Sequence, residues 1–228
     1  MNRQEVTGVT GLRERKKQRT RDALIRTAHE LFVAQGYERT TVDEIADAVE
    51  VSQRTFFRYF ANKEEVAFAL QRAVEERFFV AVGERPEHEA PLQVLRNALG
   101  TAWSGIGEVI EEVVPLELFM RMCRVIETSP TLVAVHLRRS AQQEDRLAVE
   151  IARRAGVDPE SDPRPRVLAA AFSGVLRLAG RRWAACGETS IESAQRFYEN
   201  HLDRLGPALA EDWHAAPESD GPLPERRG

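Results

Sequence analysis

Residues 38–66 read ERTTVDEIADAVEVSQRTFFRYFANKEEV, and this stretch contains three helix starts in close succession. Thr41 and Asn62 each place an N-cap oxygen three residues ahead of a glutamate, which is the capping-box spacing. Ser52 lies between them and can cap a third helix alone. The stretch therefore predicts two short helices and the beginning of another, joined by tight turns.

The second predicted helix, Gln53 to Phe60, has two different faces. Helical geometry places Phe56 and Phe60 on one side, toward a shared apolar centre. The other positions carry cations and hydrogen-bonding groups that suit the edges of DNA bases, namely Gln53, Arg54, Thr55, Arg58 and Tyr59. This pattern predicts a helix-turn-helix, whose second helix enters a major groove. The alternative is a pair of amphipathic helices in an ordinary bundle, with solvated charges.

The runs T-V-D-E-I-A, V-S-Q-R-T-F-F-R-Y-F and N-K-E-E-V resemble the DNA-binding domain of the TetR family of bacterial repressors. The resemblance covers Leu24 to Leu70, and beyond it the chain is similar to the family only in length and helical character. It implies that Thr41 touches phosphate and that Lys63 binds phosphate at the start of the fourth helix. It also implies that four side chains face the groove, namely Gln53, Arg54, Thr55 and Tyr59.

Two residues depart from the family pattern. Phe57 stands where the family usually has a tyrosine that donates its hydroxyl to phosphate, so we expect Phe57 to be a packing residue. Glu50 stands where glycine is usual in the turn. A non-glycine residue in a left-handed conformation costs on the order of 1–2 kcal/mol, so we expect a slightly reshaped turn.

Charge is divided unevenly along the chain. Residues 1–63 carry 12 Lys/Arg against 9 Asp/Glu, whereas residues 64–228 carry 20 against 27. Within the first part, Leu12 to Arg21 holds six basic residues and one glutamate. Such a cluster is typical of a phosphate-contacting surface, and the alternative for its first few charges is a solvated tail.

Composition excludes several classes of protein. The 228 residues contain no run near the ~20 apolar residues that span a bilayer, and the N-terminus lacks an apolar signal region. We therefore expect a cytoplasmic protein. Two cysteines, Cys123 and Cys186, are too few for a disulfide framework or a cysteine-rich zinc site, and we expect both in the core. His29 is expected to be exposed.

Every segment after the helix-turn-helix has helical periodicity, so the predicted fold is all-α, with about nine helices. An N-terminal three-helix domain carries the helix-turn-helix, and a C-terminal helical bundle follows. The first helix is expected from Arg13 to Gln35. The predicted division is a disordered arm at 1–11, the DNA-binding domain with a linking fourth helix at 12–82, an effector-binding and dimerisation domain at 83–214, and a disordered tail at 215–228.

The last two long helices, about 164–186 and 191–211, are the predicted dimer interface. The first of them carries apolar residues around more than one face, and its small residues at 169–171 and 173–174 permit close approach. A dimer would also place two reading heads on a palindromic site. The alternative is that this helix is the central helix of a monomeric bundle.

A hydrophobic effector is predicted to bind between helices of the C-terminal domain, where pockets are usually lined by aromatic and flexible apolar side chains. Ordinary core packing is the alternative explanation for the same residues. An acyl chain or an aromatic compound is the expected kind of ligand. The candidate lining residues are Trp103, Phe119, Met120, Cys123, Phe172 and Leu176.

Sequence motifs of common enzymes are missing. The chain has no Walker-type phosphate loop, no dinucleotide-binding glycine motif, no H-E-x-x-H and no G-x-S-x-G. We therefore expect no catalytic activity, no cofactor and no metal. The resulting hypothesis is a homodimeric repressor of a palindromic operator that a small hydrophobic ligand releases. A transcriptional activator, or a helical ligand-binding or adaptor protein without DNA binding, is the alternative.

Overall fold

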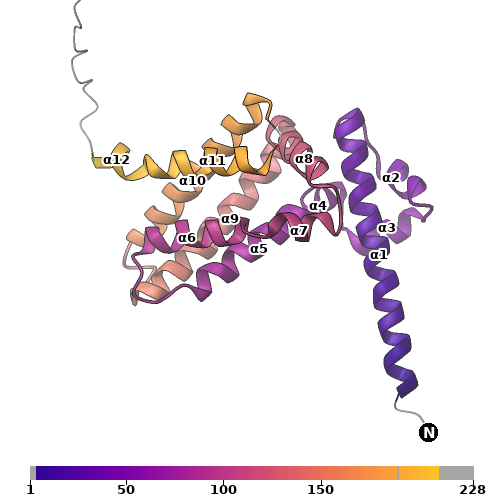
Figure 1. Ribbon diagram of the computed structural model, residues 1–228, viewed down its shortest axis with the longest axis horizontal. Helices are drawn as coiled ribbons and strands as arrows, with labels where there is room; N and C mark the ends of the chain where they lie inside the picture. The colour runs from indigo at the N-terminus through magenta and orange to yellow at the C-terminus, as the bar shows by residue number, and fades with distance from the viewer. Residues whose placement is uncertain (1–3, 189, 211–228) are drawn as a thin grey trace, which may run out of the picture.

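A computed structural model describes residues 4–188 and 190–210, and within these ranges the chain is helical and has no strand. The predicted all-α class is confirmed. The twelve helical elements are shown in Figure 1: α1 (Gln4–Gln35), α2 (Val42–Ala48), α3 (Gln53–Tyr59), α4 (Lys63–Ala67), α5 (Ala69–Glu84), α6 (Pro91–Trp103), α7 (Ile106–Glu111), α8 (Leu116–Thr128), α9 (Pro130–Ala155), α10 (Arg164–Cys186), α11 (Ile191–Asp203) and α12 (Leu205–Ala210).

Three local breaks explain why the structure has more elements than the nine expected. The predicted fourth helix is divided at Phe68, whose backbone (φ −95°, ψ 7°) leaves helical geometry. The predicted last helix is divided at Arg204. Gly105, at φ 71°, ends one helix and starts the short α7, which was not expected.

The expected N-terminal arm differs from the structure. The first helix begins at Gln4 rather than near Arg13, so residues 4–11 are helical where we expected disorder. Once a helix has formed, each added residue gains a hydrogen bond at little further cost, and nothing in this segment forces a stop. The predicted tail at 215–228 lies outside the described residues.

The N-terminal domain packs α1, α2 and α3 around one apolar core. Phe32 of α1, Ile45 of α2 and Phe56 of α3 are fully buried in it. His29 is also buried, which contradicts its expected exposure, because this face of α1 lies against α4. Its Nε2 lies 3.3 Å from the Val66 carbonyl oxygen, and burial lowers its pKa to about 4.

The C-terminal domain contains a second apolar core between α5, α6, α9 and α10, with Leu95 and Phe172 among its buried residues. Helices α9 and α11 both pack along α10. The structure contradicts the expectation that Cys186 is a core residue, because it lies exposed at the last position of α10. There the helix gives way to the left-handed Gly187.

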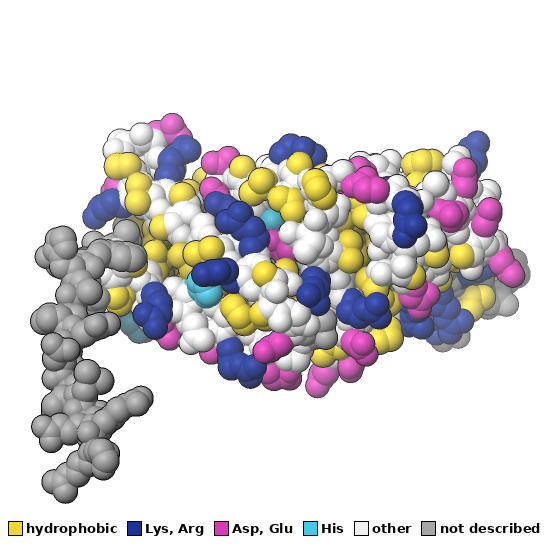
Figure 2. Space-filling view, turned by 90° about the horizontal axis from the view of Figure 1, so that it is seen from above, with side chains coloured by type: hydrophobic (Ala, Val, Ile, Leu, Met, Phe, Trp, Pro, Cys, Tyr) yellow, Lys and Arg dark blue, Asp and Glu magenta, His cyan; other side chains and the backbone are white. Residues whose placement is uncertain are grey.

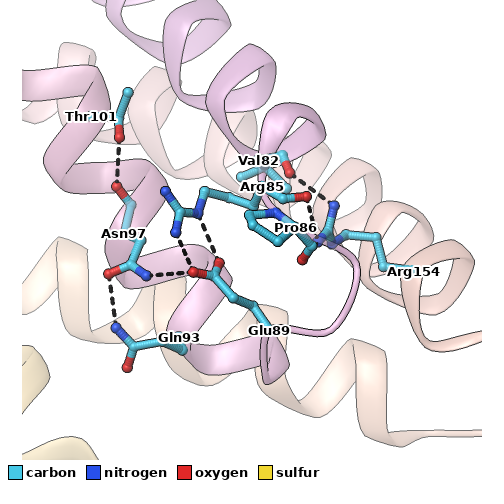
Figure 3. A network of polar contacts seen from close by, with 8 residues as sticks. All are labelled: Val82, Arg85, Pro86, Glu89, Gln93, Asn97, Thr101 and Arg154. Atoms are coloured by element: carbon cyan, nitrogen blue, oxygen red, sulfur yellow. Dashed lines mark hydrogen bonds and ion pairs between the residues drawn. The ribbon is translucent and has the colours of Figure 1, made fainter.

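Polar contacts hold the connection between α5 and α6 (Figure 3). Arg154 of α9 donates to the carbonyl oxygens of Val82, Arg85 and Pro86 at 3.2, 3.0 and 2.6 Å. Glu89 accepts from the Arg85 guanidinium at 2.8 Å. Arg154 therefore joins α9 to the C-terminal end of α5 and to the two residues that follow it.

Contacts along α1 and α8 attach the two domains to each other. Arg26 of α1 donates twice to the Val113 carbonyl oxygen, which precedes α8, at 2.9 and 2.7 Å. Figure 1 shows α1 to α3 on one side of the molecule, with the N-terminal part of α1 extending past the body. The face in Figure 2 mixes hydrophobic, basic and acidic side chains. Among the helices described, none is long and apolar enough to cross a membrane.

The turn between α2 and α3 keeps a left-handed residue at position 50 although that residue is a glutamate, so the expected reshaping is not seen at this position. Glu50 lies at φ 56°, and it is the one non-glycine residue with positive φ in the described ranges. We expect Glu50→Gly to raise the free energy of unfolding by about 1 kcal/mol, because glycine adopts this conformation without a Cβ clash. Urea denaturation of both proteins measures the difference.

Ala48→Gly is the matched control, because Ala48 is exposed and helical only two positions away. This change should lower stability by about 0.5–1 kcal/mol, since glycine in a helix loses more conformational freedom on folding. Equal effects of the two substitutions would show that Glu50 is not strained.

Candidate nucleic-acid interface and ligand cavity

The caps predicted around α3 are present. Thr41 accepts from the Glu44 backbone N–H at 3.2 Å, and the Glu44 carboxylate accepts from the Thr41 N–H at 2.8 Å. Ser52 Oγ accepts from the Thr55 N–H at 3.2 Å. At α4, Asn62 accepts from the Glu65 N–H at 2.8 Å, but the bond to the Glu65 carboxylate comes from Ala61 rather than from Asn62.

Two aromatic side chains set the orientation of α3. Phe56 is fully buried and Phe60 almost so, with ring centroids 5.7 Å apart. Burying this face turns Arg54 and Arg58 outward, and both are exposed. Within the described ranges neither guanidinium forms an ion pair. The outer face of α3 therefore presents two cations that no acidic side chain of the domain neutralises.

The other predicted groove-facing residues already make contacts inside the protein. Gln53 Nε2 donates to Asp43 Oδ1 of α2 at 2.6 Å. The Thr55 hydroxyl lies 3.0 Å from that of Ser52. Tyr59 carries the Arg58 guanidinium over its ring, 5.2 Å from the centroid. A base or phosphate would have to replace these contacts or use the remaining donors and acceptors.

The Lys63 side chain, which is predicted to bind phosphate, is already held by backbone carbonyls and an aromatic ring. Its Nζ donates to the carbonyl oxygens of Tyr37 and Thr40 at 2.9 and 2.8 Å and lies 4.1 Å from the centre of the Tyr37 ring. The ammonium group thus fastens the turn after α1 to the start of α4. One of its three N–H groups remains for a phosphate, and this contact stays a prediction.

The expectation that Phe57 is a packing residue is wrong, because 49% of its surface is exposed. Position 57 follows the buried Phe56 and is turned about 100° from it around the helix, so it leaves the core. The predicted basic stripe lies along α1, where residues 11–19 are all exposed. At its end, Arg21 lies over the Phe60 ring, 5.6 Å from the centroid, and so connects the stripe with α3.

A cavity of about 230 Å³ lies between the helices of the C-terminal domain. Five of the six predicted lining residues surround it: Trp103, Phe119, Met120, Cys123 and Leu176. Phe172 does not line the cavity. It belongs to the second core, where its ring stacks on that of Phe78 with centroids 5.9 Å apart. Phe172 and Leu176 share one side of α10 and both pack in the second core, but only Leu176, one turn later, also lines the cavity.

Polar residues in the cavity wall were missed by the sequence reasoning, among them Gln71, Glu127, His136 and Tyr198. These residues come from four different helices, α5, α8, α9 and α11. Glu127 could be recognised as unusual because it falls on the same side of α8 as Met120 and Cys123. A single polar residue in an amphipathic helix is, however, most often exposed.

Burial sets the protonation of the polar wall. It raises the pKa of the Glu127 carboxyl to about 7 and lowers that of the His136 imidazole to about 4. Arg139 and Arg177 lower the His136 pKa further. The two side chains approach to 3.8 Å, but a neutral imidazole does not make this an ion pair at neutral pH. Burial also raises the pKa of the Cys123 thiol to about 12.

A surface groove of about 280 Å³ adjoins the cavity between α6 and α11. Leu99, Trp103 and Tyr198 line both spaces, and the rings of Trp103 and Tyr198 are 5.5 Å apart. Arg96 of α6 pairs with Asp203 of α11 at the groove. These aromatic rings therefore separate the cavity from an accessible surface. In the part of the chain that the structure describes, no group of three His, Cys, Asp or Glu residues could hold a metal ion.

Sequence profiles of two families match the two domains. "Bacterial regulatory proteins, tetR family" matches residues 24–70, and "MftR C-terminal domain" matches residues 89–210. The HTH-type transcriptional regulator TcmR of Streptomyces glaucescens is 48% identical over 203 residues, which cover 89% of this chain and 90% of TcmR. MftR of Mycobacterium tuberculosis, named for regulation of mycofactocin biosynthesis, is 28% identical over 79% of this chain and 87% of its own.

Solved structures show the same fold. The complex of SmeT with triclosan has a TM-score of 0.54 at 20% identity and covers 90% of this chain and 99% of SmeT. The fatty acid degradation regulator FadR from Bacillus halodurans has a TM-score of 0.50 at 17% identity and covers 80% and 94%. With matching profiles on both domains and a relative at 48% identity, this chain belongs to the TetR family and is a transcriptional regulator.

Proposed function

We propose that this regulator represses transcription by binding a palindromic operator as a homodimer, and that a small hydrophobic molecule in the C-terminal cavity releases it. The observation that carries the proposal is the outer face of α3, where Arg54 and Arg58 are exposed and unpaired within the described residues. Regulators of the TetR family bind DNA, dimerise and bind small ligands.

Operator recognition is assigned to α3 and its surroundings. Arg54 and Arg58 can each bond a guanine edge in two places, and Gln53 suits an adenine edge once it leaves Asp43. Thr41 at the cap of α2, with Thr55 and Tyr59 on α3, would complete the contacts. The basic stripe on α1, together with Lys63, would add phosphate contacts that position the domain without reading sequence.

Dimerisation is assigned to α10 and α11. On α10, Val167 and Leu178 are 65% and 44% exposed, and the exposed Ala170 and half-buried Gly174 lie between them at helical spacing. An apolar strip with small residues at its centre suits close packing against a second copy of itself. Such a dimer would place two copies of α3 on the two halves of a palindrome.

Release from the operator is assigned to the contact between His136 in the cavity wall and Phe68 at the break after α4. His136, which lines the cavity, stacks on Phe68 with ring centroids 6.3 Å apart and planes 5° apart. Phe68 lies between α4 and α5, at the joint of the two domains. A ligand that displaces His136 would therefore move α4. It lowers operator affinity only if it binds the DNA-incompetent arrangement more tightly.

Replacing Arg54 tests base recognition. Arg54→Ala should weaken binding to the operator by roughly 1–3 kcal/mol and relax specificity at one base pair in each half-site. Footprinting on the region upstream of the protein's own gene would define the operator, and titration of that site would measure the loss. Arg138→Ala is the control, since Arg138 is exposed on α9, remote from α3. No protected palindrome with the unmodified protein would refute the proposal.

A charge placed on the apolar strip tests the dimer. The unmodified protein should scatter light as a species of twice 25.7 kDa at micromolar concentration. Leu178→Glu should shift it to the monomer and weaken operator binding, because two like charges would face each other across a two-fold interface. Val149→Glu, on an exposed apolar side chain of α9, is the control. A monomeric unmodified protein, or a dimer that survives Leu178→Glu, would contradict the assigned interface.

Filling the cavity tests ligand release. A lipophilic ligand should raise the melting temperature of the free protein and weaken operator binding over the same concentration range. Cys123→Trp should abolish both responses, since its side chain would occupy the space, while operator binding without ligand remains. Cys186→Trp, at the exposed cysteine, should leave both responses unchanged. If Cys123→Trp still responds like the unmodified protein, the effector binds elsewhere.

A further inference from the structure

The wall of the cavity contains two buried polar atoms without a partner. Gln71 Oε1 and Trp103 Nε1 are inaccessible, and within the described residues neither has a hydrogen-bonding partner. The other end of the Gln71 amide is occupied, because its Nε2 donates to Cys123 Sγ at 3.5 Å. Buried polar atoms are nearly always bonded, so these two indicate the chemistry of a molecule that the cavity holds.

The two atoms call for complementary groups. Trp103 Nε1 can only donate, and Gln71 Oε1 can only accept. A hydroxyl group satisfies either of them, because it accepts through its oxygen and donates through its hydrogen. A carboxylate cannot donate to Gln71, and a hydrocarbon can bond to neither.

Glu127 adds a second constraint at the same cavity. Its carboxyl faces His136 of α9, Tyr198 of α11 and, farther off, Arg181 of α10. A Cβ on Gly180 would lie 3.2 Å from Glu127 Oε1 and 3.1 Å from the Tyr198 hydroxyl oxygen. Glycine at this position therefore lets the carboxyl and the phenol lie close to one part of α10.

Neighbouring charges in the wall are already paired. Arg177 pairs with Glu144, and Glu75 accepts from Arg139 at 2.7 Å. Among the described residues, Glu127 has no Lys or Arg within ion-pair distance. An anionic ligand would thus meet an acidic group and no available cation. An uncharged ligand avoids both the repulsion and the cost of burying its own charge.

We propose that the effector is an uncharged, largely apolar molecule with at least one hydroxyl group, read by Gln71 and Trp103, and that Glu127 disfavours ligands bearing a carboxylate. This inference rests on the proposed function, because it assigns the ligand class of the cavity described there. An apolar lining alone would bind a free fatty acid and a hydroxylated aromatic or aliphatic compound equally well. The polar groups of the wall predict that the hydroxylated compound binds more tightly. A cavity of about 230 Å³ limits the buried part to a compact skeleton.

Three probes with one aromatic skeleton test the inference: 2-naphthylmethanol, 2-methylnaphthalene and 2-naphthoate. Calorimetry on the full chain gives the affinity of each, and operator titration gives its power to release DNA. The alcohol should bind about three- to tenfold more tightly than the methyl compound, which is the net effect of one or two hydrogen bonds. The carboxylate should bind the least tightly.

Conservative variants test whether Gln71 and Trp103 cause the preference for the alcohol and whether Glu127 disfavours the carboxylate. In Gln71→Met/Trp103→Phe the alcohol should lose its advantage over the methyl compound, while the affinity of the methyl compound itself stays nearly constant. Because the measured quantity is a ratio within one protein, a general loss of stability cancels. Gln142→Met, on the exposed side of α9, is the control and should keep the ratio. Glu127→Gln has the same size without the charge. It should improve the affinity of 2-naphthoate about twofold at pH 7 and about tenfold at pH 8, where a carboxyl with a pKa of about 7 is mostly ionised.

Different results would overturn different parts of the scheme. Equal affinities for the alcohol and the methyl compound, or tightest binding of the carboxylate, would refute this inference and leave the repressor proposal standing if the probes release DNA. An unchanged ratio in the double variant would also refute it. If none of the probes binds, or if they bind without any effect on the operator complex, the effector cavity of the proposed function is itself wrong.

Discussion

Burial of Phe56 and Phe60 is the constraint on which the DNA-binding half of the molecule depends. These two rings fill the space between α1, α2 and α3. Only one orientation of α3 about its own axis buries both of them. Arg54 and Arg58 face outward because the opposite side of the helix is committed to the core. The capping bonds of Thr41 and Ser52 then fix where α2 and α3 begin.

Phe68 gives the second half of the molecule its link to the first. It is buried at the break between α4 and α5, it packs under the Arg139 guanidinium at 5.1 Å, and it stacks on His136. One side of this contact belongs to the core of the DNA-binding domain and the other to the wall of the cavity. Packed interiors change between discrete arrangements rather than deforming gradually, so in the proposed release mechanism this stacked pair would transmit the change from the cavity to α4.

The cavity combines an apolar wall with a few polar groups that belong to different helices. Gln71, Glu127, His136 and Tyr198 come from α5, α8, α9 and α11. Each is an unremarkable polar residue within its own helix. Burial raises the pKa of Glu127 to about 7, and burial together with Arg139 and Arg177 lowers that of His136 to about 4. At neutral pH Glu127 is therefore only partly ionised and His136 is neutral. The chemistry of the site thus arises from packing rather than from any local motif.

Sequence alone determined the all-α class, the caps of α2 and α3 and the outward cations of α3, because capping and helical periodicity are local properties. Five of the six side chains that the sequence predicted to line the cavity do line it. Only the tertiary structure decided that His29 is buried, that Phe57 is exposed, that Phe172 belongs to another core, and that Lys63 is held by the carbonyls of Tyr37 and Thr40. The physical reason is that helical spacing tells which residues share a face, whereas burial and bonding depend on which other helix covers that face.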